Sequence, residues 1–128
     1  MTPSIIKLPN KLRGILFIED SGLLFIGAGT QCGCYGLSED KWLWNDNNIL
    51  DFVCWQHLGD AVIMHAEREV SCWNVRGRLL WGAYLSDNWT INVEGEDAVT
   101  LTDNGDIHHF NLYVGPPWTK NMLTSQST

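Results

Sequence analysis

Basic residues are scarce in this sequence, and their scarcity excludes one large class of partner. The 128 residues contain 8 Lys and Arg against 15 Asp and Glu, so the formal net charge is −7 at pH 7. Binding to nucleic acid needs a basic surface that displaces the counterions of the phosphates. The densest group of basic residues is the pair Arg76 and Arg78. Two arginines in one turn do not form a basic surface. We therefore expect no nucleic-acid partner.

Long apolar runs are lacking as well. The longest apolar stretches, GILFI and GLLFIGAG, are far shorter than the roughly 20 residues that span a bilayer. The amino-terminal stretch MTPSIIKLPNKLRG has neither the apolar core nor the small-residue cleavage site of a secretory signal. These features predict a cytoplasmic protein with no membrane contact, whose four cysteines are reduced thiols.

Signatures of catalysis and of metal binding are also missing. The sequence has no Gly-rich phosphate loop, no nucleophile elbow and no Ser/His/Asp order. Cys32 and Cys34 share a strand face, but structural zinc needs two more ligands. His108 and His109 are adjacent on a strand and point to opposite faces. The sequence thus predicts no catalytic residue, no metal and no cofactor, and it predicts that the cysteines are small buried side chains.

Short strand-like segments and tryptophan are what the sequence has in abundance. Hydrophobic residues make up 45% of the chain, and there are seven Trp. Helical periodicity is poor, whereas apolar segments such as AVIMHA, WTINV and AVTLT stand between Gly, Asn and Asp about every ten residues. The pattern predicts an all-β fold.

A repeat of 37 or 38 residues organises these strands. Three features recur in three copies: an apolar residue, an aromatic residue eleven positions later, and a Trp eight or nine positions after that. The three sets are Leu24, Tyr35 and Trp44; Val62, Trp73 and Trp81; and Val99, Phe110 and Trp118. This spacing suits a four-stranded antiparallel sheet repeated three times. The repeated Trp then fill space between sheets, and Arg76-Gly77-Arg78 forms a turn between two strands.

The expected boundaries follow from the repeat. One domain covers residues 1–118, with repeats at about 12–48, 49–85 and 86–118, and residues 119–128 form a tail. In the third repeat we expect strands at 88–93, 98–102 and 107–114, with the acidic segments 94–97 and 103–106 as turns. Residues 4–8 are expected to supply a closing strand that completes the last sheet and protects its edge.

The segments AVTLTDNGDIHHFNLYVGPPW and AVIMHAEREVSCWNVRGRLLW resemble blades of quinoprotein and WD40-like β-propellers. That resemblance implies propeller-like blades, and propellers usually close with four to eight of them. Three repeats therefore predict a half-propeller that a homodimer completes to six blades around a two-fold axis. The spacing is more weakly similar to the β-prism of bulb lectins. That family's sugar-site pattern would fall on Thr102, Asn104, Asp106, His108 and Phe110. Of these residues, only the aromatic Phe110 matches the pattern.

Aromatic residues outside the common repeat are the candidate binding residues: Trp42, Trp55, Tyr84 and Trp89. The first functional reading is a non-enzymatic binding or protein-interaction module with a protein or small-molecule ligand. A carbohydrate-binding, lectin-like protein is the second, and an enzyme whose site forms at a dimer axis is the third.

Overall fold

The computed structural model describes residues 14–117. All of its regular elements are strands, which form three antiparallel sheets in chain order. The all-β prediction is therefore confirmed. The closing strand expected at 4–8, Trp118 and the tail at 119–128 lie outside the described residues.

Each sheet is an up-and-down meander of neighbouring strands. The first sheet contains β1 (Ile15–Ile18), β2 (Leu23–Ala28), β3 (Gln31–Gly36) and β4 (Lys41–Asp46). The second contains β5 (Phe52–Leu58), β6 (Ala61–Ala66), β7 (Glu69–Asn74) and β8 (Leu79–Tyr84). The third contains β9 (Trp89–Gly95), β10 (Ala98–Asp103) and β11 (Asp106–Phe110).

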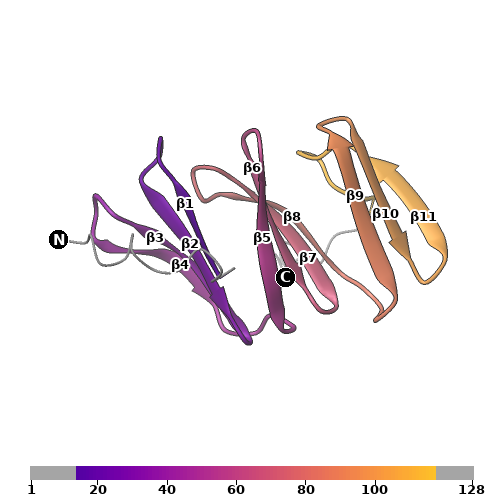
Figure 1. The fold of residues 1–128 in the computed structure, drawn as a ribbon, viewed down its shortest axis with the longest axis horizontal. Coiled ribbons are helices and arrows are strands. Elements are labelled where there is room, and N and C mark those ends of the chain that lie inside the picture. The colour runs from indigo at the N-terminus through magenta and orange to yellow at the C-terminus, as the bar shows by residue number, and fades with distance from the viewer. Residues whose placement is uncertain (1–13, 118–128) are drawn as a thin grey trace, which may run out of the picture.

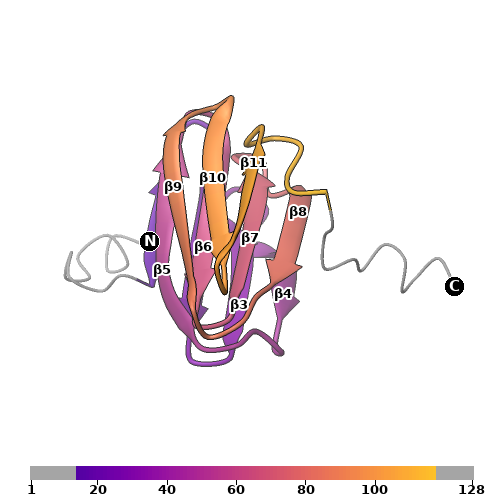
Figure 2. The ribbon, with the colours of Figure 1, turned by 90° about the vertical axis from the view of Figure 1, so that its right-hand side faces the viewer.

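The sheets stand face to face like propeller blades, with the second between the other two (Figure 1). Viewed along the row of sheets, the opening strands β5 and β9 lie at one edge and the closing strands β4 and β8 at the other (Figure 2). Sheets packed in this way leave two outer faces, one on the first sheet and one on the last.

One equivalent backbone hydrogen bond shows the repeat in atomic detail. After the third strand of each sheet, an N–H donates to the carbonyl of the turn before the second strand. The three bonds are Leu37 to Gly22 at 2.9 Å, Val75 to Asp60 at 2.9 Å and Leu112 to Glu96 at 2.6 Å. The chain therefore builds the same sheet corner three times.

The described residues give the third sheet three strands, as expected for 86–118, and the fourth strand expected from residues 4–8 lies outside them. One feature of this sheet differs from the sequence prediction. Its last strand ends at Phe110 and not at 114, because the chain turns there: the Asn111 side-chain oxygen accepts a bond from the Tyr113 N–H at 2.8 Å, and the Asn111 carbonyl accepts one from Gly115 at 2.9 Å.

Two apolar clusters fill the spaces between the sheets. Phe25, Cys34, Met64 and Trp73 belong to the cluster between the first and second sheets. Ile63, Cys72, Trp81, Val99 and Leu101 belong to the cluster between the second and third. Burial of these side chains against a facing sheet supplies the main stabilisation of such a stack.

The repeated tryptophans join neighbouring sheets, as the sequence predicted for Trp44 and Trp81. The Trp44 indole stacks on Trp73 with ring centroids 4.8 Å apart, and its Nε1 donates to the Gly77 carbonyl at 2.7 Å. The Trp81 Nε1 donates to the Leu112 carbonyl at 2.6 Å. Each indole thus fills an apolar gap and satisfies its own N–H on a loop of the next sheet.

Candidate functional site: the outer face of the first sheet

The outer face of the first sheet carries large apolar side chains that no other sheet of residues 14–117 covers. Successive strand residues point to opposite faces, and Leu16, Phe25, Cys34 and Trp44 point toward the second sheet. The alternate residues therefore face outward. We call this surface the first-sheet face; it comprises Ile15, Phe17, Leu24, Ile26, Gly33, Tyr35, Trp42 and Asn45.

A β-bulge determines that Trp42 belongs to this face. Trp42 and Trp44 are two residues apart and would share a face on a regular strand. The pairing of β3 with β4 shifts between Cys34 and Tyr35, so that Cys34 faces Trp44 and Tyr35 faces Trp42. The extra residue, Leu43, turns the two indoles to opposite sides. One Trp thus enters the core, and the other stays 47% exposed.

Residues of the first-sheet face occupy repeat positions that are buried elsewhere in the chain. Leu24 and Tyr35 correspond to Val62 and Trp73, which pack against the first sheet. In the third repeat the same positions hold Val99 and Phe110, which pack against the second sheet. On the first sheet no other described sheet lies opposite these two positions, although Leu24 is only 3% exposed and Tyr35 is half-buried.

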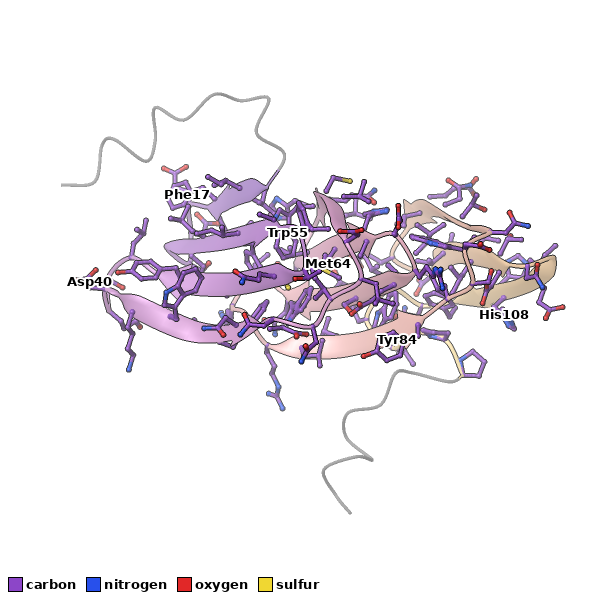
Figure 3. The ribbon with its side chains drawn as sticks, turned by 90° about the horizontal axis from the view of Figure 1, so that it is seen from below. Phe17, Asp40, Trp55, Met64, Tyr84 and His108 are labelled. Carbon is purple, nitrogen blue, oxygen red and sulfur yellow. The ribbon has the colours of Figure 1, made fainter. Side chains whose placement is uncertain are left out.

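Three aromatic side chains, Phe17, Tyr35 and Trp42, lie in one row across this face. They are neighbours in the strand register together with Leu24, which stands between Phe17 and Tyr35 and is buried. The Tyr35 and Trp42 rings meet edge to face with centroids 5.3 Å apart. The Tyr35 hydroxyl donates to the Asp40 carboxylate, and this hydrogen bond raises the pKa of Tyr35 above its usual value. Phe17 is 46% exposed at the end of the row, and Figure 3 shows it at the edge of the first sheet.

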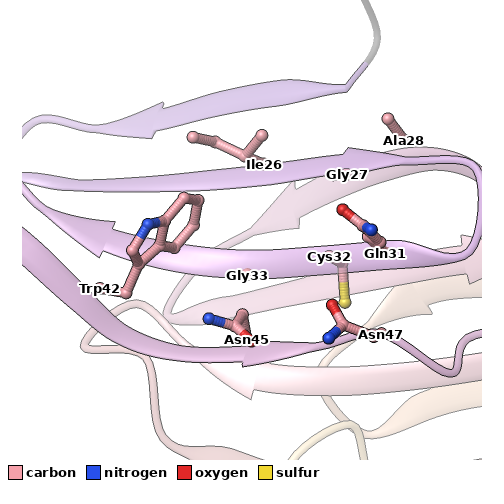
Figure 4. Close-up of a pocket in the computed structure, with 9 residues that line it drawn as sticks. All are labelled: Ile26, Gly27, Ala28, Gln31, Cys32, Gly33, Trp42, Asn45 and Asn47. Carbon is pink, nitrogen blue, oxygen red and sulfur yellow. The ribbon is translucent and has the colours of Figure 1, made fainter.

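Beside this row lies a hollow of about 340 Å³ (Figure 4). Its floor is formed by glycine: a Cβ atom at Gly33 would stand 2.7 Å from Cζ3 of Trp42, so the indole lies directly over the backbone there. Ile26 and Ala28 give it apolar walls, and its polar lining is the three side-chain amides of Gln31, Asn45 and Asn47. No charged side chain lines the hollow. Within residues 14–117 these three amides are not engaged by other side chains and point to solvent, so the site suits an uncharged, partly aromatic or apolar group that can also exchange hydrogen bonds.

The outer face of the last sheet is polar. We call it the last-sheet face; it comprises Thr90, Asn92, Glu94, Thr100, Thr102, Ile107 and His109. Thr100 and His109 occupy the positions of Ile63 and Cys72, which are buried in the second sheet. In the third sheet they form a surface hydrogen bond between Thr100 Oγ1 and His109 Nδ1 at 3.1 Å. Ile107 is the exposed apolar exception, at 61%.

The structure does not bring the four candidate binding residues onto one surface. Trp42 lies on the first-sheet face. Trp55 is part of the first core cluster, where its Nε1 donates to the Gly14 carbonyl at 3.1 Å. Trp89 packs at the second cluster, stacks on His65 and donates from Nε1 to the Glu67 carbonyl at 2.7 Å. Tyr84 is 55% exposed at the end of β8, the edge of the second sheet opposite Trp55 (Figure 3).

Sequence reasoning missed four residues of the site: Phe17, Gln31, Asn45 and Asn47. They lie outside the common repeat features, and three of them are polar residues of a kind usual on any surface. The available signal was the two-residue alternation of ILFI and LLFIGA, which assigns Phe17 to the face of Leu24. Knowing that no sheet of the described chain covers that face requires the structure.

The cysteines are buried as the sequence predicted, except for the half-buried Cys54. Burial raises the pKa of Cys34 to about 11 and that of Cys72 to about 12, so both stay protonated thiols at neutral pH and are poor nucleophiles. Within residues 14–117, no three His, Cys, Asp or Glu side chains are grouped so that they could hold a metal ion. The same residues contain no helix long and apolar enough to cross a membrane.

No family model matches this chain, and no curated protein is significantly similar to it. Solved structures with a similar backbone include the N-terminal domain of Nup159, which is 10% identical with a TM-score of 0.44 over 77% of this chain and 33% of that chain. Kluyveromyces lactis Hsv2 is 14% identical with a TM-score of 0.41, over 82% of this chain and 33% of that chain. An S. cerevisiae complex of Dbp5 with Nup159 and Gle1 gives 13% identity and a TM-score of 0.46, over 83% and 32%.

The chain spans about a third of the length of these structures. Sequence identities and TM-scores as low as these assign the chain to no family. Its class, an all-β protein of three blade-like antiparallel sheets, follows from its own strand order and sheet packing.

Proposed function

We propose that the chain is a non-enzymatic protein-interaction module that pairs with a second copy of itself through the first-sheet face. The observation that carries the proposal is the exposure of two large side chains, Phe17 at 46% and Trp42 at 47%, on a sheet face whose counterparts in the second and third sheets pack against another sheet. Leaving Phe17, Trp42 and their neighbours in water forgoes burial worth about 25 cal/mol per Å² of apolar surface. A contiguous exposed apolar patch of this kind is typical of an interaction site.

The polarity of the last-sheet face determines which surface of the second copy fits. In the six-bladed ring expected from the sequence, the first-sheet face of one chain would cover the last-sheet face of the other. That contact would take Glu94, Asn92 and His109 out of water against apolar partners, at a cost of about 1–3 kcal/mol for each unsatisfied polar group. Pairing of the two apolar faces carries no such cost, so the second copy binds like face to like face.

The size of the face predicts a reversible dimer. Four strands about 4.8 Å apart and six residues of about 3.3 Å each give a flat area of roughly 400 Å². Stable interfaces bury about 800 Å² per partner, and smaller ones belong to transient complexes. We therefore expect self-association in the micromolar range, strengthened by salt because both copies carry a net charge of −7.

Sedimentation velocity over a range of protein concentrations tests the proposal. The unmodified chain is expected to sediment as a monomer–dimer equilibrium. Trp42→Asp is expected to weaken the dimer about 100-fold, because it places a carboxylate in the interface at a cost of about 3 kcal/mol. Ile107→Asp is the matched control, since it puts the same charge at a more exposed apolar residue of the last-sheet face. A chain that stays monomeric at every concentration, or equal effects of the two substitutions, would contradict self-association through this face.

Carbohydrate binding is the second candidate, and the composition of the hollow favours it. An exposed indole beside three amides and no charged group is suited to a neutral sugar ring, which presents C–H groups on one face and hydroxyls at its edge. Titration of neutral mono- and disaccharides against intrinsic Trp fluorescence should show a saturable change that Trp42→Phe reduces. No change with any neutral sugar would remove this candidate.

A further inference from the structure

One edge of the third sheet is open where the other two sheets have a further strand. In the first and second sheets, β3 and β7 are interior strands that pair with β4 and β8. Their counterpart β11 pairs with β10, and no strand of residues 14–117 lies along its other side. In Figure 2, β4 and β8 lie beyond β11 on this side of the stack. An open strand edge offers backbone hydrogen-bonding groups to any extended segment.

The backbone groups of Ile107 and His109 form this edge. The hairpin between β10 and β11 has a two-residue turn, 104–105, so the residues on either side of the turn are a hydrogen-bonded pair. The backbone groups then alternate between the two sides of β11, and those of Ile107 and His109 point away from β10. Their counterparts in the second sheet, Val70 and Cys72, pair with β8.

We infer that this edge of β11 is a docking site for a strand, and that residues 118–121 of the same chain occupy it as the fourth strand of the third sheet. The inference is independent of the proposed self-association, because β11 belongs to the sheet at the opposite end of the stack from the first-sheet face (Figure 1).

The spacing of the third repeat fits this docking. Trp118 follows Phe110 by eight residues, as Trp81 follows Trp73. On β7, the residue that pairs with Trp81 is the one before Trp73. The same register pairs Trp118 with His109.

The corner after β11 turns the chain as the corner before β8 does. In both corners an Asn side-chain oxygen accepts the backbone N–H two residues later, at 2.9 Å for Asn74 and 2.8 Å for Asn111. Both corners then pass through a glycine with a φ of 87°, Gly77 or Gly115. Its N–H donates to the carbonyl of that Asn at 2.9 Å. The first corner leads into β8, so we expect the second to lead the chain back along β11.

The two prolines after this corner fall where a strand tolerates them. Counted back from the Trp, Pro116 and Pro117 take the places of Leu79 and Leu80. Leu79 is the first residue of β8, and Leu80 is the extra residue of a bulge in the pairing with β7. Proline lacks an N–H and is accepted at strand starts and bulges. Pro116 is buried, so the chain is still packed against the sheets one residue before the described part ends.

Charge also favours this segment. Residues 79–117 contain no Lys or Arg, and Lys120 is the only basic residue after Arg78. A positive side chain is attracted to an acidic region of this kind. The region carries most of the net charge through Asp87, Glu94, Glu96, Asp97, Asp103 and Asp106.

The amino-terminal segment that the sequence predicted for this place is too far away in the same chain. Gly14 hydrogen-bonds to Gly27 of the first sheet at 2.7 Å. With sheets about 10 Å and strands about 4.8 Å apart, the position beside β11 is about 25 Å from there. The six residues from position 8 to position 14 span at most about 21 Å. Residues 4–8 therefore do not reach it.

Cross-linking within one chain tests the register in a Cys54→Ser background, which removes the one partly exposed thiol. The inferred register makes His108 and Thr119 a non-hydrogen-bonded pair, in which side chains are closest. His108→Cys with Thr119→Cys should therefore form an intramolecular disulfide on mild oxidation. His108→Cys with Lys120→Cys is the matched control, because neighbouring strand residues point to opposite faces. It should link at least about tenfold more slowly.

Amide hydrogen exchange measured by NMR tests the backbone pairing. In the inferred strand the Lys120 N–H bonds to Ile107, whereas the Thr119 N–H points away from β11. Lys120→Pro should speed exchange of the Ile107 amide about fivefold, the effect of one lost hydrogen bond. Thr119→Pro, which removes an N–H on the solvent side, should leave that rate unchanged.

Each other result overturns the inference. Equal linking of the two cysteine pairs, or none, would mean that residues 118–121 do not pair with β11. Linked dimers in place of linked monomers would mean that a second copy supplies the strand. An Ile107 amide that exchanges without protection in the unmodified chain would mean that the edge stays open. None of these results bears on self-association through the first-sheet face, and a monomeric chain in sedimentation velocity leaves this inference intact.

Discussion

The outer faces of the first and last sheets are built from the same repeat but have opposite character. Phe17, Tyr35 and Trp42 dominate the first-sheet face, whereas threonine, asparagine and histidine dominate the last-sheet face. Stacked repeats need a polar outer surface where the stack ends in water. The last sheet meets that requirement and the first does not. The described part of the chain is therefore asymmetric: its last sheet ends in a polar face, and its first sheet ends in a face with exposed aromatic side chains.

Making the last-sheet face resemble an internal one should have the largest effect on this comparison. The double substitution Thr100→Ile with His109→Cys installs the residues that Ile63 and Cys72 supply in the second sheet. The chain then presents two apolar faces, and a contact between unlike faces can continue without closing. We expect species larger than a dimer in sedimentation velocity. A variant that keeps the folded circular-dichroism spectrum and the dimer of the unmodified chain would show that apolarity does not direct association here.

A glycine pair gives a smaller and more local test. A Cβ atom at Gly33 would collide with Trp42 at 2.7 Å, whereas one at Gly95, in the third sheet, would meet nothing within 4 Å. Gly33→Ala should displace the exposed indole and weaken self-association about tenfold, a loss of about 1.4 kcal/mol. Gly95→Ala should leave the association constant unchanged. Equal behaviour of the two variants in sedimentation equilibrium would mean that the Trp42 position is irrelevant to binding.

The smallest expected effect is a pH dependence of stability that arises at one repeat position, which is internal in the second sheet and on the outer face of the third. His65 lies between the second and third sheets and bonds to Gln56 Oε1 at 2.9 Å, while its repeat equivalent Thr102 lies on the last-sheet face. Burial lowers the pKa of His65 below its usual value of 6.5. The unfolded chain therefore binds the proton more readily, and folding stability should fall as the pH decreases below about 6.5.

Urea unfolding between pH 7.5 and 5 checks this prediction. His65→Gln should flatten the pH dependence, and His109→Gln, at an exposed histidine, should not. If the free energy of unfolding of His65→Gln depends on pH as strongly as that of the unmodified chain, other groups cause the dependence.

The enzyme alternative and the cytoplasmic location remain predictions.

Much of the fold could be predicted from the sequence because its signals are local and repeated. The spacing of Tyr35, Trp73 and Phe110 predicted three sheets, and the hydrogen-bonded indoles of the partly buried Trp44 and the buried Trp81 confirm their expected place between sheets. The segment Arg76-Gly77-Arg78 is the turn that was expected. Gly77 has a φ of 87°, and the exposed arginines flank it.

The candidate site was much less predictable. The sequence analysis chose four aromatic residues as binding candidates because they lie outside the common repeat: Trp42, Trp55, Tyr84 and Trp89. Only Trp42 lies on the first-sheet face. Trp55 and Trp89 each satisfy an indole N–H on a backbone carbonyl beside the core, which residue type and spacing do not reveal.

The sequence by itself determined the strands, their meander order and the repeated core, because two-residue alternation, turn residues and a fixed period are properties of neighbouring positions along the chain. Only the tertiary structure decided which faces are covered. A residue such as Leu24 has the same local pattern as Val62, and what separates them is whether another sheet lies opposite. The bulge at Leu43, which sends Trp42 outward and Trp44 inward, is likewise set by pairing across strands rather than by the order of residues.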